Sequence, residues 1–234
     1  MKNVYIFGDS HTDPILRAMR QFKELNPIEA VSWPCTMSNI GRRKLELIDI
    51  KRKCVYDNYN IDNGHNIIIH DVNLNDLIKD GDIICFCFGE IDCRAHLCKP
   101  QNLKTQKELI DIIVDKYFDT IRLNVEQFNN LEVIVCCVVP ATRTSGTNLF
   151  ESYSPGPFPF YGTDEERKSA GLYVNLKLKE YCIKYNHIFL DIYDKYCDDN
   201  GFLNPTMKDH QVHIKENVYI VEFLNNLINQ EKWN

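Results

Sequence analysis

Short, continuously apolar segments that alternate with long helical segments place the strongest limit on how this chain can fold. The apolar segments lack period-two alternation, which is typical of strands buried on both faces. Strands that alternate with long helices favour a parallel sheet between two helix layers, an α/β architecture. We predict strands at 3–7, 28–33, 82–88, 132–139 and 187–191, a weaker strand at 67–70, and helices at 14–25, 105–128, 164–185 and 217–230.

The chain length favours one domain. At about 150 residues per domain, the 234 residues form a single unit, 1–234, in which we expect a small inserted hairpin or cap at 42–81. The formal charge of −6 disfavours a nucleic-acid partner, which would need a basic face. No apolar run approaches the roughly 20 residues that span a bilayer. The oligomeric state stays open.

Ten cysteines would suggest a disulfide framework in a secreted protein. The segment after Met1 has no apolar region followed by a cleavage site, so we expect a cytoplasmic location and reduced thiols. Several cysteines stand in strand-like segments, such as Cys85 and Cys87, where a thiol packs as a small hydrophobe. No paired CxxC is present, so we predict no metal site.

Functional groups in parallel sheets collect at the carboxyl ends of the strands. The first such group is Gly8-Asp9-Ser10-His11, directly after a buried strand and before a helix. Backbone amides and the helix dipole favour a developing anion there, which suits a nucleophilic serine. The same residues also suit a simple turn and helix cap.

The second group follows the most apolar strand, in the run 88–96 with Glu90, Asp92, Arg94 and His96. Loops on a rigid scaffold often carry sites, so we predict a functional loop. An Arg–carboxylate pair that only fixes the loop is the other interpretation.

The third group is Asp209, His210 and His213, just before the last helix. A nucleophilic serine needs a base, and a base benefits from an orienting carboxylate. Taken alone, these residues are better explained by a polar loop with two exposed imidazoles.

In this order the three groups resemble the SGNH (GDSL-type) hydrolases. Gly8-Asp9-Ser10 matches the Gly-Asp-Ser block, Gly41 the glycine of the second block, and Gly89 and Asp92 part of the Gly-x-Asn-Asp block. The last match is the Asp-x-x-His block before the final helix. The resemblance spans nearly the whole chain and implies a flavodoxin-like three-layer α/β/α sandwich with a parallel five-stranded sheet.

Two departures from the family pattern bear on activity. Ile91 stands where the family has an oxyanion-hole asparagine, and losing one such donor costs about 10²–10³ in turnover unless Arg94 or His96 replaces it. Asp209 lies four residues before His213 instead of three, and His210 takes the expected acid position. We expect a one-residue bulge that still lets Asp209 orient His213. A Ser–His dyad supported by a backbone carbonyl is the alternative.

The resemblance implies a serine esterase or O-acyltransferase that needs no cofactor. Ser10 would attack the ester, His213 would act as base, and Asp209 would orient His213. The amides of Ser10 and Gly41, aided by Arg94, would hold the oxyanion. The substrate expected is a small-molecule or glycan ester, with an O-acetylated carbohydrate first. Residues predicted to bind it are Asp9, His11, Gly89, Glu90, Asp92 and His96.

The rival hypothesis is a catalytically impaired protein of the same fold that binds a glycan or nucleotide-sugar without turning it over. The replaced asparagine and the altered Asp–His spacing would then be signs of lost catalysis. A further segment, 142–171, is rich in Gly, Pro and aromatic residues, and long loops are often functional. Phe158, Phe160 and Tyr161 in it would line an acyl or sugar pocket or plug the edge of the core.

Overall fold

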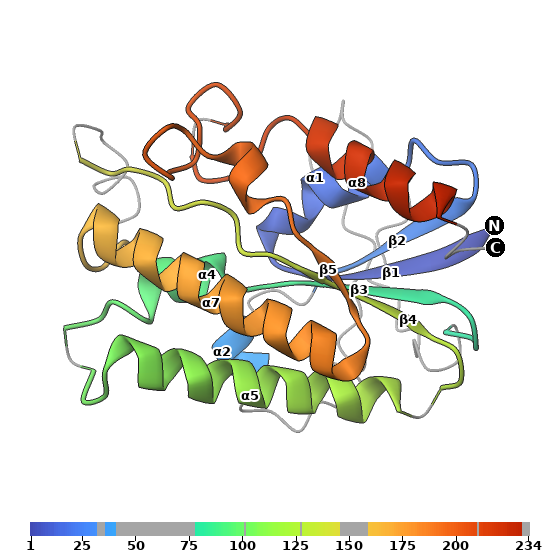
Figure 1. Ribbon diagram of the computed structural model, residues 1–234, viewed down its shortest axis with the longest axis horizontal. Helices are drawn as coiled ribbons and strands as arrows, with labels where there is room; N and C mark the ends of the chain where they lie inside the picture. Colours follow the sequence, from blue (N-terminus) through green and yellow to red (C-terminus); the bar gives the residue numbers. More distant parts are fainter. Residues whose placement is uncertain are drawn as a thin grey trace.

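A five-stranded sheet, parallel throughout, forms the centre of the protein (Figure 1). The computed structural model describes residues 1–31, 36–40, 78–100, 102–126, 128–145, 159–209 and 211–230. The strand order is β2-β1-β3-β4-β5. The strands are β1 (Lys2–Gly8), β2 (Leu25–Val31), β3 (Ile83–Cys87), β4 (Glu132–Cys136) and β5 (Ile188–Leu190).

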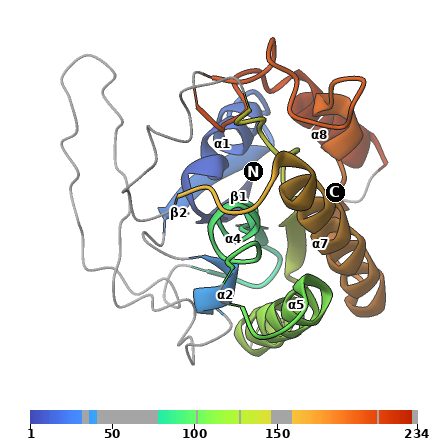
Figure 2. The same ribbon diagram turned by 90° about the vertical axis from the view of Figure 1, so that its left-hand side faces the viewer.

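Helices cover both faces of the sheet, as the apolar strands predicted (Figures 1 and 2). Alternate strand residues divide between two apolar cores: Val4 and Ile6 face one, Tyr5 and Phe7 the other. The first core includes residues of α1 (Asp13–Met19) and α8 (Val218–Asn229), and the second includes residues of α5 (Gln106–Val125) and α7 (Asp164–Tyr185). The short helices α2 (Met37–Ile40) and α4 (Glu90–Ala95) lie on the side of α5 and α7. The three-layer α/β/α sandwich is therefore confirmed.

The two long helices begin where the sequence predicts because each has a complete capping box. Thr105 and Thr163 accept a hydrogen bond from the amide of the glutamate three residues later, and each glutamate side chain accepts one in return. Such caps satisfy amides that have no partner inside the helix. Asn186 ends α7 in the left-handed conformation. Thus the predicted helix at 164–185 is confirmed at both ends, and that at 105–128 ends three residues earlier.

Two predictions need correction. The helix predicted at 14–25 ends at Met19, because the chain must reverse before Leu25, which pairs with Lys2 as the first residue of β2. The run after β3 is a helix, α4, and its six residues are buried. The predicted strand at 67–70, the end of the strand at 28–33, and most of the insertion predicted at 42–81 lie outside the described residues.

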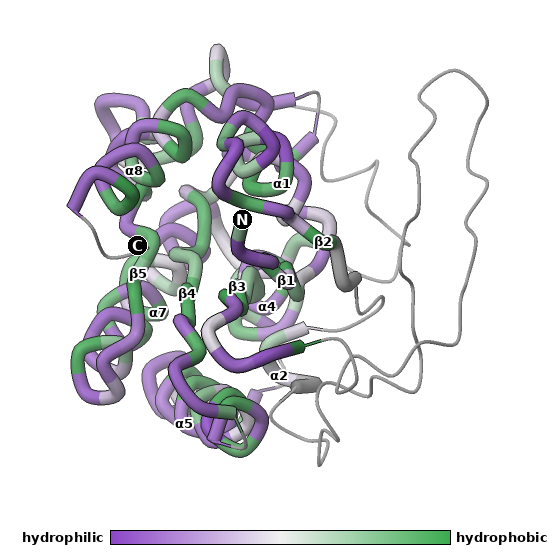
Figure 3. The backbone as a smooth tube through the Cα atoms, turned by 90° about the vertical axis from the view of Figure 1, so that its right-hand side faces the viewer, coloured by the Kyte–Doolittle hydropathy of each residue, from purple (hydrophilic) through white to green (hydrophobic). Residues whose placement is uncertain are grey.

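The cysteines behave largely as core residues. All eight in the described part of the chain are free thiols, and six of these are buried. Those on the strands belong to one of the apolar cores, and Figure 3 colours residues of β1, β3 and β4 as hydrophobic. Burial raises the pKa of Cys137 and of Cys182 to about 12, so both stay protonated and unreactive.

The described residues include no helix that is both long and apolar enough to cross a membrane.

Gly8, the last residue of β1, should be sensitive to any side chain. A Cβ there would lie 2.4 Å from the Cys87 carbonyl oxygen and 2.4 Å from Thr12 Cγ2. We therefore expect Gly8→Ala to lower the free energy of unfolding by about 1–3 kcal/mol through overpacking, measured by urea denaturation. Gly171→Ala is the control, since a Cβ there meets nothing within 4 Å and should be neutral or stabilising by up to about 1 kcal/mol. Equal stabilities for the two variants would contradict this account.

Candidate active site

The strand order brings the predicted site residues to one edge of the sheet. β1 lies beside β3 and the chain reverses its winding between them, the position where parallel sheets form a crevice at their carboxyl ends. Ser10 follows β1 and Glu90 follows β3. The segment 208–214 precedes α8, which packs beside α1. Residues about 200 positions apart in the sequence are thereby neighbours.

Ser10, His213 and Asp209 form one chain of hydrogen bonds. The Ser10 hydroxyl lies 2.9 Å from His213 Nε2. On the other side of the ring, His213 Nδ1 lies 2.8 Å from Asp209 Oδ2. With Nδ1–H held by the carboxylate, Nε2 is left to accept the serine proton. Ser10 is exposed and His213 is partly exposed, so a substrate can reach the pair.

A tight loop accommodates the four-residue spacing between Asp209 and His213. The Asp209 amide donates to the His213 carbonyl at 2.9 Å, and a bridge between Lys208 and Ile214 closes the loop. Val212 and Ile214 are buried and anchor the loop. The extra residue relative to the family pattern therefore leaves the carboxylate against the ring. His210, the alternative acid, lies outside the described residues.

Asp209 is held as a carboxylate. Burial raises its pKa, but hydrogen bonds from the His213 ring and from the Gln211 amide outweigh burial, so the pKa is lowered overall. Oδ1 accepts the Gln211 amide at 2.7 Å and the His213 amide at 3.1 Å. These bonds fix the carboxylate through the backbone, so Oδ2 is aimed at the imidazole.

Three of the residues predicted to bind substrate are buried. Asp9, His11 and Glu90 are each at most 9% exposed. Asp9 Oδ1 accepts hydrogen bonds from the His11 amide at 2.9 Å and from the His11 ring at 2.8 Å. The contact between His11 and Glu90 joins η1 (Ser10–Thr12) to α4. Direct contact of these residues with a substrate stays a prediction.

Gly89 and Asp92 hold two helices together. Gly89 has φ +123°, which favours glycine, and a Cβ there would lie 2.9 Å from Met37 Cε. The Asp92 carboxylate accepts the amides of Met37 at 2.8 Å and Ser38 at 3.1 Å, at the start of α2. His96 Nδ1 lies 3.1 Å from the same carboxylate. Asp92 thus fixes α2, whose last residue directly precedes Gly41 in the sequence.

Replacing Asp92 by Asn should destabilise the protein. The amide group loses one acceptor oxygen and turns a donor toward a backbone N–H. Leaving a buried amide without an acceptor costs about 1–3 kcal/mol, measured as a lower midpoint in urea. Asp80→Asn is the matched control, because Asp80 also accepts two hydrogen bonds, from Asn129, but at the surface. Equal losses in the two variants would contradict a special role for Asp92.

Arg94, predicted to help hold the oxyanion, forms an ion pair with Glu90. Its Nε donates to Glu90 Oε1 at 2.9 Å and its Nη2 to Glu90 Oε2 at 3.2 Å, inside the protein. Its charge is therefore balanced by Glu90. Ile91 is buried and has no donor, and Gly41 lies outside the described residues.

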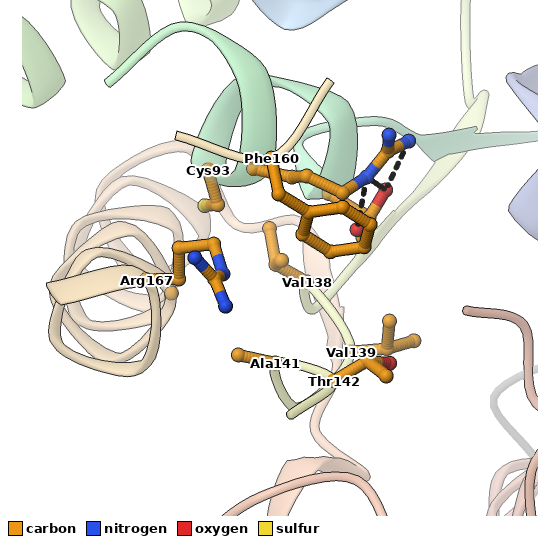
Figure 4. A pocket seen from close by; sticks show the side chains of 10 residues that line it. Cys93, Val138, Val139, Ala141, Thr142, Phe160 and Arg167 are labelled. Atoms are coloured by element: carbon orange, nitrogen blue, oxygen red, sulfur yellow. Dashed lines mark hydrogen bonds and ion pairs between the residues drawn. The ribbon is translucent and has the colours of Figure 1, made fainter. Parts of the chain in front are cut away.

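A small cavity lies beside Glu90 and Arg94, and only part of its lining was predicted from the sequence (Figure 4). Its volume of about 10 Å³ corresponds to about one water molecule. Phe160, one of the aromatic residues predicted to line a pocket, lies between the guanidinium groups of Arg94 and Arg167, each 5.1 Å from the ring centre. Phe160 also clusters with Val212 of the base loop. Phe158 lies outside the described residues.

Arg167 is buried and no motif marked it as important. It donates to the carbonyls of Tyr161 and Gly162 and to Asp164. Asp164 in turn accepts the amide of Thr144 at 2.9 Å. These bonds tie the segment before α7 to the segment after β4. Thr144 and Asp164 are 20 positions apart, and a pairing at that separation leaves no local signal in a sequence.

Cys93, inside the charged run, lines the same cavity. Burial, followed by the nearby Asp92 and Glu90 carboxylates, raises the pKa of its thiol well above the usual value. A thiol in that state is a poor nucleophile.

No protein-family model matches the sequence, and a search of curated proteins gave no match. Solved structures do match. A carbohydrate acetylesterase from Sinorhizobium meliloti has a TM-score of 0.54 at 12% identity, over 98% of this chain and 99% of that one. An acetyl xylan esterase has a TM-score of 0.54 at 13% identity, over 97% and 99%.

A member of the lipolytic G-D-S-L family from Veillonella parvula has a TM-score of 0.51 at 14% identity, over 97% of both chains. At such identities the likeness concerns the fold. The fold of this chain is therefore that of the SGNH (GDSL-type) hydrolases.

Proposed function

We propose that the protein is a serine ester hydrolase in which Ser10 is the nucleophile. The observation that carries this proposal is the continuous hydrogen-bond chain from the exposed Ser10 hydroxyl through His213 to Asp209. A weakly nucleophilic hydroxyl becomes reactive when a positioned base takes its proton. His213 is within the distance that such a transfer requires.

In the first step Ser10 Oγ attacks the ester carbonyl while His213 Nε2 takes the hydroxyl proton. The Asp209 carboxylate stabilises the imidazolium that forms. The tetrahedral intermediate collapses, its bond to the alcohol oxygen breaks, and His213 returns the proton to that oxygen. Water, activated by His213, then attacks the acyl-serine, releases the carboxylic acid and restores Ser10.

Backbone amides are the oxyanion donors that we assign. Ser10 begins η1, and amides in a first helical turn have no partner inside the helix. The Gly41 amide is the second donor, by the resemblance of its sequence block. Because Glu90 balances Arg94, we give Arg94 no direct contact with the oxyanion.

We propose a small acyl group, acetyl, carried on a carbohydrate. Two of the matching structures are described as a carbohydrate acetylesterase and an acetyl xylan esterase. A sugar hydroxyl in place of water as the acceptor would make the same site an acyltransferase.

Release of acetate from O-acetylated oligosaccharides tests this function, with p-nitrophenyl esters of two, four and eight carbons as a second series. We expect turnover to be highest for acetyl and to fall with chain length, and Ser10→Ala gives the background. Hydrolysis of every ester at the background rate would contradict the proposal. It would favour binding of a glycan without turnover.

A further inference from the structure

A second histidine, His11, lies directly behind the proposed base and has no place in the mechanism above. Its ring centre is 4.8 Å from that of His213, with the rings tilted by 48°. Its side chain is buried, whereas that of His213 is partly exposed. His11 also follows Ser10 immediately in the chain. It therefore contacts both partners of the serine–histidine pair, one through the backbone and one through its ring.

Two buried carboxylates face the two ring nitrogens of His11. Asp9 Oδ1 lies 2.8 Å from Nδ1, and Glu90 Oε2 lies 3.7 Å from Nε2. Within the described residues, neither Asp9 Oδ2 nor His11 Nε2 has a hydrogen-bond partner. Arg94 pairs with Glu90 from the far side. A proton on both ring nitrogens of His11 satisfies this arrangement better than a proton on one.

The charge balance of the buried group supports the same state. The group holds two carboxylates, Asp9 and Glu90, and one guanidinium, that of Arg94, which pairs with Glu90; a neutral His11 would therefore leave one uncompensated negative charge inside the protein. Uncompensated buried charges are costly, and balanced ones are tolerated. A cationic His11 brings the four side chains to neutrality.

The carboxylates around His11 favour the same state, although burial and the Arg94 guanidinium oppose it. Burial lowers the pKa of His11, but the Asp9 carboxylate, its hydrogen bond and Glu90 outweigh burial, so the pKa is raised above its usual 6.5. Burial raises the pKa of Glu90, and Arg94 and His11 outweigh it, so that pKa is lowered. Besides these groups, His213 packs against the ring, and the Cys87 thiol donates to the His11 carbonyl at 3.6 Å.

We propose that His11 is a positioning residue that acts as a buried cation: held between Asp9 and Glu90, it fixes the Ser10 turn and the face of His213. Its catalytic meaning rests on the proposed esterase function, but its charge state does not. Loss of its proton would leave two buried carboxylates opposed by Arg94 alone and would loosen the surface on which His213 rests.

The pH dependence follows from the direction of the shift. The group is protonated more readily in the folded protein than in the unfolded one, so its stabilising contribution is complete below about pH 6.5. That contribution is lost as the pH rises through the folded value, which lies higher. We therefore expect a fall in kcat on the alkaline side with the same midpoint as the His11 titration.

Ring-¹⁵N NMR of the full chain against pH tests the charge state without any activity measurement. We expect both His11 nitrogens to carry protons at pH 6.5, and the midpoint to move to lower pH in Glu90→Gln. A neutral His11 ring at that pH would overturn the proposal, as would an unmoved midpoint. This measurement does not depend on ester hydrolysis, so failure of the His11 proposal can be distinguished from failure of the proposed function.

The pH profile of kcat tests the positioning role. His11→Asn retains a donor where Nδ1 stands but carries no charge. We expect kcat to fall about tenfold or more, since small misplacements of reacting groups cost up to about 10²-fold, with KM nearly unchanged and the alkaline fall absent. His187→Gln is the control, because His187 lies against Phe118 and Tyr185, and its profile should match the unmodified protein. An alkaline fall retained in His11→Asn would overturn the proposal.

Discussion

Removing the Ser10 hydroxyl is expected to lower kcat for acetyl esters by about 10⁴–10⁶, the loss typical of removing the nucleophile of a serine triad. Ser10→Ala keeps the turn after β1 and removes only the oxygen that lies 2.9 Å from His213 Nε2. Steady-state kinetics with p-nitrophenyl acetate measures the loss. The urea midpoint of the variant should match that of the unmodified protein, because Ser10 is exposed.

The double variant Ser10→Ala, His213→Gln sharpens this prediction. Residues that act as one unit are strongly non-additive, so the double variant should be no slower than either single variant. Multiplicative losses would show that Ser10 and His213 act independently. A Ser10→Ala variant that retains more than about a tenth of kcat would exclude Ser10 as the nucleophile. Removing even a single oxyanion donor lowers kcat by more than that, about 10²–10³.

Replacing Asp209 by Asn is expected to lower kcat by about 10³–10⁴, while the loop stays folded. An amide cannot balance the imidazolium that forms on His213, and it favours the wrong ring tautomer. The same replacement of the buried aspartate in a serine-protease triad lowers kcat by about 10⁴. KM should change little, because the carboxylate contacts the base. Kinetics on acetyl esters measures both constants.

Asp198 offers a closely matched control for Asp209. Its Oδ1 accepts amides two and four residues ahead, from Asn200 at 2.8 Å and Phe202 at 3.0 Å. Asp209 Oδ1 does the same with Gln211 and His213. Asp198→Asn should therefore cost similar stability with no loss of kcat. Equal kcat in the two variants would make Asp209 a loop-forming residue only, as in the dyad alternative.

The layers of the fold could be predicted from the sequence because each segment carries its own signal. Thr163 and Glu166 mark a helix start within four residues, and the apolar run 83–87 indicates burial without reference to partners. The end of α1 at Met19 could not be predicted, because the amphipathic pattern continues through Phe22, which still packs against the core. The end of α1 is set by the register of β2 on β1, and strand register depends on residues that are distant in the sequence.

In the site, too, some features could be predicted from the sequence and others depend on distant partners. The order of Ser10, Asp209 and His213 predicted which residues meet, and the structure brings these three together. The charged run 90–96 was expected to face a substrate, but most of its charges are satisfied within the fold: Glu90 by Arg94, and Asp92 by the amides of α2. Asp92 and Met37 are 55 positions apart, a pairing that a single sequence cannot reveal.

Mass-spectrometric mapping of a fluorophosphonate adduct tests the central claim most directly, since the probe reacts with an activated serine. We expect one adduct, on Ser10, that forms much more slowly in His213→Gln and is absent from Ser10→Ala. No adduct, an adduct on another residue, or an unchanged labelling rate in His213→Gln would contradict that claim.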